Sequence, residues 1–271
     1  EPLGGTDWGN VNIDNIEAAI NRAIELGINF FDTADVYGLG LSEERLSSIL
    51  GPRIHDMTIA TKGGVCWFKD QFKERARTSI NCSVPYIQKA VEDSLRRLNL
   101  DCLPLYYIHN PDPDTEIKHT FECLSKLQSQ GKIKLLGCSN YNSHQLSQAC
   151  EVAKISVVQI PVNFLLGAPS QALVDTCVKY DVKIVAYNVL SWGLLTGKYN
   201  NSSKFETNDR RSQLPLFQTE KLEKALKIVN KAKISAKSEG LSIGQYAINW
   251  VLQQKRIASA ITGIKNVEQA E

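Results

Sequence analysis

Ionisable side chains stand where several apolar segments of this sequence end, and their types suit proton transfer. Asp32, Lys62 and His109 each end an apolar run of strand length. Tyr37 lies five residues beyond Asp32, in a stretch that also contains two glycines. A carboxylate, an ammonium group, an imidazole and a phenol that meet in one cavity can transfer a proton to a carbonyl oxygen.

A tyrosine is an efficient proton donor near neutral pH only if its neighbours change its acidity. The ordinary pKa of a phenol is about 10, and a nearby ammonium group lowers it because the phenolate becomes more stable. We expect Asp32 to hold Lys62 in a buried ion pair, and His109 to bond the substrate oxygen. Because no side chain supplies hydride, reduction of a carbonyl would also require a cofactor.

Each of these side chains has an ordinary explanation as well. A lysine after a strand is often solvated, a histidine at a strand end is often structural, and Asp32 could cap a turn. In a barrel, however, the carboxyl ends of all strands meet at one edge, where the chemistry of such folds takes place. Further polar residues occupy the same kind of position, namely Ser139, Asn140, Gln159 and Tyr187. Together these residues favour a functional site.

Short apolar segments alternate with amphipathic ones along the chain. The predicted strands are 28–32, 57–62, 103–109, 134–140, 157–162, 183–189 and 258–264. The predicted helices are 14–26, 43–50, 83–98, 116–130, 143–153, 169–180, 220–238 and 242–253. This alternation indicates a parallel sheet covered by helices.

We interpret the pattern as one (β/α)8 barrel domain over residues 1–271, with a doubly wound open sheet as the alternative. A closed barrel needs eight strands, so we expect the first strand to be missing or truncated, with residues 1–5 as its trailing end. The sequence starts without methionine and ends in an apparent helix, and we therefore expect both natural ends to lie outside it.

Composition limits the partners that this protein is expected to have. The formal net charge of +2, from 31 basic and 29 acidic residues, gives no electrostatic reason to expect nucleic acid or an anionic membrane. No apolar run approaches the roughly 20 residues of a membrane-spanning helix. Seven scattered cysteines without a C-x-x-C pair argue against a zinc site and fit a reducing compartment. We expect a cytoplasmic protein that holds no metal and acts on a small molecule.

Five stretches in this order, FDTADVYGLGLSEE, ATKGG, LYYIHNPDP, GKIKLLGCSN and SWGLLTGKY, closely resemble the aldo-keto reductases. The resemblance runs from about residue 12 to residue 271. It implies a (β/α) barrel that binds NADP(H) without the dinucleotide-binding βαβ fold and that reduces aldehydes, ketones or sugar-type carbonyls. By matching position, the implied catalytic residues are Asp32, Tyr37, Lys62 and His109, with Tyr37 as the proton donor.

The same resemblance implies a cofactor site. Ser139, Asn140 and Gln159 match residues that hold the nicotinamide carboxamide, and Tyr187 matches the aromatic residue on which the nicotinamide stacks. The pyrophosphate loop is matched by Leu190, Gly193, Leu194, Thr196, Gly197 and Lys198. The segment for the adenosine 2′-phosphate is matched by Gly263, Lys265 and Gln269, with Glu271 near the adenine. A cation at Lys265 favours NADP over NAD, although a solvated lysine at a helix start is the alternative.

The residues around this site match the family pattern less closely than the catalytic and cofactor residues do. Asn110 stands where a basic residue is commoner after the histidine, and Val162 stands where an aromatic residue is often found. We expect Trp67, Phe68 and Trp8 to line the substrate pocket from loops at its mouth. The polar segment 199–218 is long for a loop, and we expect it to fold over bound cofactor and to be poorly ordered without it. Arg210 and Arg211 in it could contact phosphate or solvent.

Two other functions are compatible with these residues. A non-catalytic or regulatory NADPH-binding subunit could share the fold. A barrel aldolase could use Lys62 as a Schiff-base nucleophile, but Asp32 beside it would raise the pKa of the lysine rather than lower it.

Overall fold

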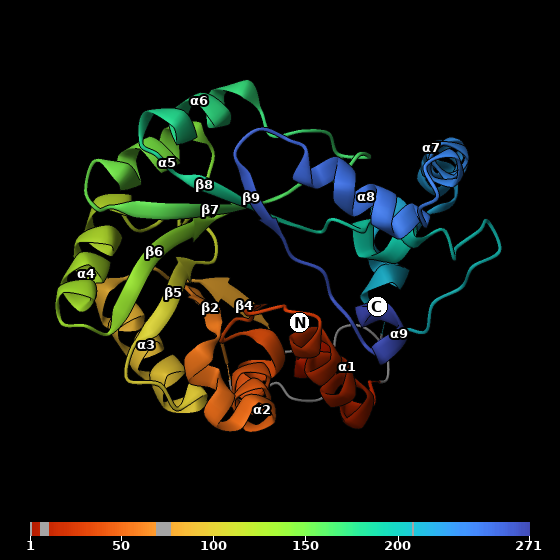
Figure 1. Cartoon of the computed structure of the whole chain (residues 1–271). Coiled ribbons are helices and arrows are strands. Elements are labelled where there is room, and N and C mark those ends of the chain that lie inside the picture. The colour runs from red at the N-terminus through yellow and green to blue at the C-terminus, as the bar shows by residue number, and fades with distance from the viewer. Residues whose placement is uncertain (1, 6–10, 69–76, 208) are drawn as a thin grey trace.

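Seven parallel strands form the main sheet of the computed structural model, which describes residues 2–5, 11–68, 77–207 and 209–271. The strands are β1 (Phe30–Asp32), β2 (Thr58–Gly63), β5 (Leu103–Ile108), β6 (Ile133–Ser139), β7 (Ile155–Pro161), β8 (Lys183–Tyr187) and β9 (Ile257–Ala260). They are paired in this order, and every pair is parallel. The sheet curls, and helices cover its outer side (Figure 1).

Helices follow the strands in alternation. They are α1 (Ile13–Glu25), α2 (Leu41–Leu50), α3 (Val84–Leu98), α4 (Ile117–Ser129), α5 (Ser143–Cys150), α6 (Gln171–Lys179), α7 (Thr219–Ser238), α8 (Ile243–Leu252) and α9 (Val267–Ala270). Local sequence explains several starts: Asn142 with Gln145 and Ser242 with Gln245 form capping boxes, in which each side chain bonds the other residue's backbone N–H. No helix among the described residues is long and apolar enough to cross a membrane.

Short elements fill the connections. The 3-10 helices are η1 (Pro2–Gly4), η2 (Tyr37–Gly40), η3 (Gly51–Asp56), η4 (Ser191–Thr196), η5 (Arg210–Gln213) and η6 (Pro215–Phe217). An antiparallel hairpin of β3 (Val65–Trp67) and β4 (Thr78–Ile80) follows β2.

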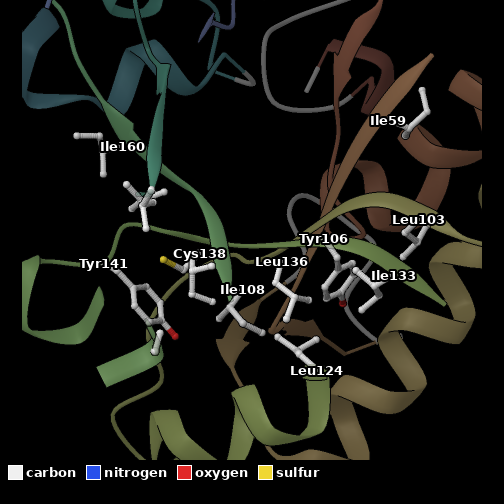
Figure 2. Packing of buried hydrophobic residues seen from close by; sticks show 14 of the residues in the cluster. Ile59, Leu103, Tyr106, Ile108, Leu124, Ile133, Leu136, Cys138, Tyr141 and Ile160 are labelled. Atoms are coloured by element: carbon white, nitrogen blue, oxygen red, sulfur yellow. The ribbon is translucent and has the colours of Figure 1, made fainter. Parts of the chain in front are cut away.

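The two faces of the strands belong to different parts of the core. Ile59, Tyr106 and Leu136 lie between the sheet and the helices, in a large apolar cluster that includes Leu124 of α4 (Figure 2). Because side chains alternate along a strand, the neighbouring positions point to the inside of the curl. There a separate cluster consists of Phe30, Ala60, Leu105, Tyr107 and Val157.

Polar residues lie next to the inner cluster, one layer further toward the carboxyl ends of the strands. Asp32, Lys62 and Gln159 each lie two positions beyond a member of that cluster on the same strand and therefore on the same face. They form the next layer toward the carboxyl ends of the strands. This is the edge at which barrels of parallel strands carry their chemistry.

All seven predicted strands are present, and the predicted (β/α)8 class is confirmed. A doubly wound sheet reverses its strand order at a switch point, whereas here the order follows the chain without reversal. Two predictions were wrong. Pro2–Gly4 form a 3-10 helix and not the end of a strand, and the hairpin of β3 and β4 lies where only loop was expected.

Candidate active site

A buried ion pair joins the ends of the first two strands. Lys62 Nζ donates to Asp32 Oδ1 and, at 2.8 Å, to the carbonyl oxygen of Thr33. The Lys62 side chain is 1% exposed and that of Asp32 is 7% exposed. Burying a charge costs several kcal/mol unless a partner compensates it, so each of these groups requires the other.

Gln159 completes the environment of the carboxylate from across the barrel. Its Nε2 donates to Asp32 Oδ2 at 2.7 Å, so that both oxygens of Asp32 accept a hydrogen bond. Tyr107 lies beneath this layer, and burial, followed by the charge of Asp32, raises the pKa of its phenol well above the ordinary value. The residue predicted to contact a carboxamide therefore also orients Asp32.

Tyr37 and His109 face each other above the ion pair. Their ring centroids are 5.7 Å apart, with the rings nearly perpendicular at 83°. Lys62 Nζ lies 5.0 Å from the centroid of the Tyr37 ring. The structure thus brings together all four side chains that the sequence singled out.

His109 is a neutral imidazole in this environment. Burial, and secondly the positive charge of Lys62, lower the pKa of His109 to about 3. Its Nδ1 is buried and has no hydrogen-bond partner among the described residues. His109 can therefore bond a substrate oxygen without carrying a charge to it.

The turn that carries Tyr37 requires glycine. Gly38 has a φ of +60°, and its backbone packs against Gly4, where a side-chain Cβ would lie only 2.6 Å from Gly38 N. A hydrogen bond of 2.8 Å between the hydroxyl groups of Thr33 and Ser42 closes the base of the turn. The glycines of this stretch therefore allow η1 and the Tyr37 turn to touch.

Asn140, which follows β6, forms hydrogen bonds with residues at the ends of β5 and β8. Its Nδ2 donates to the carbonyl oxygen of His109 and to Asn110 Oδ1, both at 2.9 Å. Tyr187 donates its hydroxyl to Asn140 Oδ1 at 2.7 Å. Ser139 is buried at the end of β6, next to Asn140. The predicted nicotinamide residues thus lie around the four central side chains.

The predicted pyrophosphate loop is a tight turn after β8. Asn188 Oδ1 accepts from the backbone N–H of Trp192 at 3.0 Å, and the next residue, Gly193, has a φ of +89°. At Gly197 a Cβ would lie 2.6 Å from Cε of Lys233, whose Nζ donates to the Gly197 carbonyl at 3.0 Å.

Side chains of this loop are largely engaged within the protein. Leu194 is fully buried in an apolar cluster that also contains residues of α7 and α8, and Leu190 packs against that cluster. The Thr196 hydroxyl donates to the Gly193 carbonyl at 2.7 Å. Contacts from Leu194 to a cofactor would therefore come from its backbone.

Three cations from separate segments converge at the end of this loop, namely Lys198, Arg211 and Lys265. Burial lowers the pKa of Lys265, and the charge of Arg211 and, more weakly, that of Lys198 lower it further, while Asp209 raises it. Arg211 forms an ion pair with Asp209, with Nε to Oδ1 at 2.9 Å. Asp209 is the carboxylate that the described contacts place in this cluster, and a cluster of cations suits a phosphate group.

The chain beyond β9 forms a closed turn. The Lys265 N–H donates to Gln269 Oε1 at 2.9 Å, and Gly263 lies beside Pro2. The carboxylate of Glu271 pairs with Arg22 of α1 at 3.2 Å. Helices α1 and α9 accordingly lie side by side (Figure 1).

Segment 199–218 has a small core of its own. Tyr199, Phe205 and Phe217 contact one another edge to face, with centroid distances from 4.9 to 5.8 Å. The Arg211 guanidinium lies 5.0 Å from the centroid of Phe205. That the segment becomes ordered by a cofactor stays a prediction.

Two of the three residues predicted to line the substrate pocket lie in the described part of the chain. Trp67 lies on strand β3 rather than in a loop, and Phe68, directly after it, is 57% exposed. Trp8 lies outside the described residues. Their contact with a substrate stays a prediction.

A buried polar cluster behind Lys62 was not predicted. Glu43, which is 0% exposed, accepts from the Thr61 hydroxyl at 2.5 Å and from Arg97 Nε at 2.6 Å. Asp35 lies near them, and its Oδ1 has no hydrogen-bond partner among the described residues. Burial, and secondly the charge of Glu43, raise the pKa of Asp35 well above the ordinary value.

A barrel of parallel strands with these four groups at its carboxyl edge is typical of oxidoreductases that act on carbonyl and CH–OH groups. The sequence model described as "Aldo/keto reductase family" matches residues 3–271, and the chain belongs to this family.

Relatives support the assignment. The chain is 31% identical to "Aldo-keto reductase yakc [NADP(+)]" of Schizosaccharomyces pombe, over 94% of this chain and 75% of that protein. It is 32% identical to "Aldo-keto reductase YhdN" of Bacillus subtilis, over 99% and 80%. Among solved structures, a glycerol dehydrogenase from Gluconobacter oxydans is similar with a TM-score of 0.88 and 34% identity, over 99% of this chain and 82% of that one.

Proposed function

We propose that this protein is an NADP(H)-dependent aldo-keto reductase. It transfers hydride between nicotinamide and an aldehyde, a ketone or a sugar-type carbonyl, and its single domain carries both cofactor and substrate sites. The observation that carries this proposal is the convergence of Tyr37, His109 and the Lys62–Asp32 pair at one end of the barrel.

Tyr37 is the general acid in this proposal. It donates its phenolic proton to the carbonyl oxygen during reduction and takes a proton back during oxidation. Lys62, close to the Tyr37 ring, stabilises the phenolate that remains. Asp32 keeps Lys62 charged and in place, and Gln159 keeps Asp32 oriented.

His109 binds the oxygen that accumulates negative charge. A neutral imidazole can donate a hydrogen bond there without competing with Tyr37 as the proton donor. A bound nicotinamide supplies the hydride, which no side chain can provide.

The residues present fit NADP(H). Ser139, Asn140 and Gln159 offer amide and hydroxyl groups beside the four central side chains, and Tyr187 offers an aromatic ring. The converging cations Lys198, Arg211 and Lys265 suit the phosphates of this cofactor. The name of the fission yeast relative, which includes NADP(+), supports the same choice.

Two observations bear on the substrate and on the alternatives. The similar glycerol dehydrogenase supports small hydroxylated substrates, oxidised as polyols or reduced as their carbonyl forms. The ion pair of Lys62 with Asp32 argues against a Schiff-base aldolase, because that reaction needs a neutral amine. No contact in the described part of the chain favours a purely regulatory subunit.

Fluorescence titration with NADPH, followed by a panel of simple aldehydes, ketones and sugars, tests the proposal. We expect binding and turnover, and we expect Tyr37→Phe to abolish reduction while NADPH binding is retained. Tyr180→Phe is the matched control, because that hydroxyl contacts Ser147 at 3.1 Å on the helical side. Full turnover by Tyr37→Phe would remove Tyr37 from its role.

A further inference from the structure

A glycine on β6 makes room for an aromatic ring inside the barrel. Tyr107 of β5 is paired with Lys62 on one side and with Gly137 on the other. A Cβ at Gly137 would lie 2.5 Å from Cδ1 and 2.6 Å from Cε1 of the Tyr107 ring. The ring therefore occupies the place that a side chain on β6 would otherwise take.

This position brings the ring toward strand β7. The same Cβ at Gly137 would lie 2.9 Å from the carbonyl oxygen of Val157, the residue paired with Gly137 on β7. Gln159 stands two residues beyond Val157 on that strand and therefore on the same inner face. The phenol of Tyr107 thus leans across β6 toward the strand that carries Gln159.

The hydroxyl group of Tyr107 is buried next to polar groups of the active site. Tyr107 is fully buried, and no atom in the part of the chain that the structure describes meets the geometry of a hydrogen bond with its hydroxyl. Burial, and secondly the charge of Asp32, raise the pKa of the phenol, and the amide of Gln159 is close enough to lower it in part. Because a buried hydroxyl without a partner is unfavourable, a small rotation that joins it to Gln159 would stabilise the protein.

Gln159 can take this additional partner without losing its bond to Asp32. A glutamine amide offers two N–H donors and one oxygen acceptor. The bond of 2.7 Å from Nε2 to Asp32 Oδ2 uses one of the two donors. The other N–H and the amide oxygen can each bond a hydroxyl group, which both accepts and donates.

We propose that Tyr107 is a positioning residue whose hydroxyl bonds the Gln159 amide and thereby holds the carboxylate of Asp32 in place. The hydroxyl restricts the amide, and the amide restricts the carboxylate that pairs with Lys62. This inference rests on the proposed function, in which that ion pair supports Tyr37 as the proton donor. It adds a residue that acts on the reaction from the layer below, without touching the reacting atoms.

A double-mutant cycle tests whether Tyr107 acts through Gln159. Tyr107→Phe removes the hydroxyl and keeps the ring, whereas Gln159→Leu removes the amide. The measured quantity is kcat/KM for a simple aldehyde at saturating NADPH. We expect Tyr107→Phe to lower it about three- to tenfold in the wild-type background, the range of one neutral hydrogen bond. In the Gln159→Leu background we expect a change of less than about twofold, because the partner of the hydroxyl is already gone.

Tyr106→Phe is the matched control. Tyr106 is the adjacent residue, is equally buried, and also has a hydroxyl without a partner in the described part of the chain. Its side chain lies on the opposite face of β5, in the apolar cluster beneath the helices (Figure 2). We expect this variant to retain kcat/KM within about twofold of the wild-type value.

Urea denaturation of the same four proteins extends the cycle to variants without measurable turnover. Tyr107→Phe should shift the urea midpoint more in the wild-type background than in the Gln159→Leu background, because the two side chains are coupled. Equal shifts in the two backgrounds would contradict the proposed bond.

Three kinetic results would overturn the inference. Tyr107→Phe could retain the full kcat/KM, it could lower kcat/KM by the same factor with and without the Gln159 amide, or Tyr106→Phe could lower kcat/KM as much. The second result would make Tyr107 a packing residue only. A wild-type protein that reduces no compound of the carbonyl panel would instead overturn the proposed function itself.

Discussion

Glu43 and Asp35 are both buried acids, yet we expect opposite consequences when each is neutralised. Glu43→Gln removes the negative charge that balances Arg97, whose side chain is 9% exposed. Breaking a buried pair from one side costs about 3–5 kcal/mol of the free energy of unfolding. Asp35 lies close to Arg97, and the pKa of Asp35 falls once Glu43 is neutral. Asp35 can then ionise and replace part of the lost negative charge. We therefore expect a net loss of about 2–4 kcal/mol at pH 7.

Asp35→Asn should leave the free energy of unfolding within about 1 kcal/mol of the wild-type value, because an amide resembles the protonated acid. The pH dependence gives an independent check. An unfolded aspartate releases its proton near pH ~3.9, whereas folded Asp35, with its raised pKa, retains it. Folding then keeps a proton that the unfolded chain releases, so stability falls as the pH rises above about 4, by at most about 1.4 kcal/mol per pH unit. Asp35→Asn should remove this slope.

Urea denaturation followed by circular dichroism measures both variants, with Glu223→Gln on the exposed face of α7 as the control for charge removal. Two results would refute the reasoning. One is a Glu43→Gln variant as stable as the control. The other is an Asp35→Asn variant as unstable as Glu43→Gln, which would mean that Asp35 is ionised in the folded protein.

Further predictions concern the active site and the packing behind it. Because the pKa of His109 is lowered to about 3, the profile of kcat/KM for reduction should have no inflection near pH ~6.5; an inflection there that His109→Gln removes would contradict this. Lys265→Ala should weaken NADPH about tenfold or more, and far more than NADH, in fluorescence titrations; equal losses would mean that Lys265 does not read the 2′-phosphate. Gly63→Ala places a Cβ 2.0 Å from the Tyr106 hydroxyl and should reduce the free energy of unfolding by about 1–3 kcal/mol, while Gly244→Ala, whose Cβ would meet Ser242 Oγ at an ordinary 3.9 Å, should not; similar urea midpoints for the two variants would contradict the packing.

Much of the architecture could be predicted because the relevant signals are local. Apolar runs of strand length and helical periodicity identified every strand of the main sheet. Asp32, Lys62 and His109 stand where those runs stop, and parallel strands bring their ends to one edge. The meeting of these residues therefore follows from their positions alone.

The remaining features depend on contacts between distant segments. Glu43 stands at the start of a predicted helix, where no local signal indicates burial, and its pairing with Thr61 and Arg97 explains why it is buried. Gln159 carried no sign that its amide would bond Asp32 from a strand far along the chain. The β3–β4 hairpin is too short for a periodic signal, since each strand has three residues.

The contact of Gly4 with Gly38 makes the proton donor sensitive to a segment that contributes no reacting group. A methyl group at residue 4 would lie 2.6 Å from Gly38 N and 2.9 Å from the carbonyl carbon of Tyr37, so the two backbones would have to move apart. Because this movement includes the backbone of Tyr37, it would act on the proton donor whichever substrate is bound. The N-terminal segment therefore belongs to the support of the active site, although none of its side chains takes part in the chemistry.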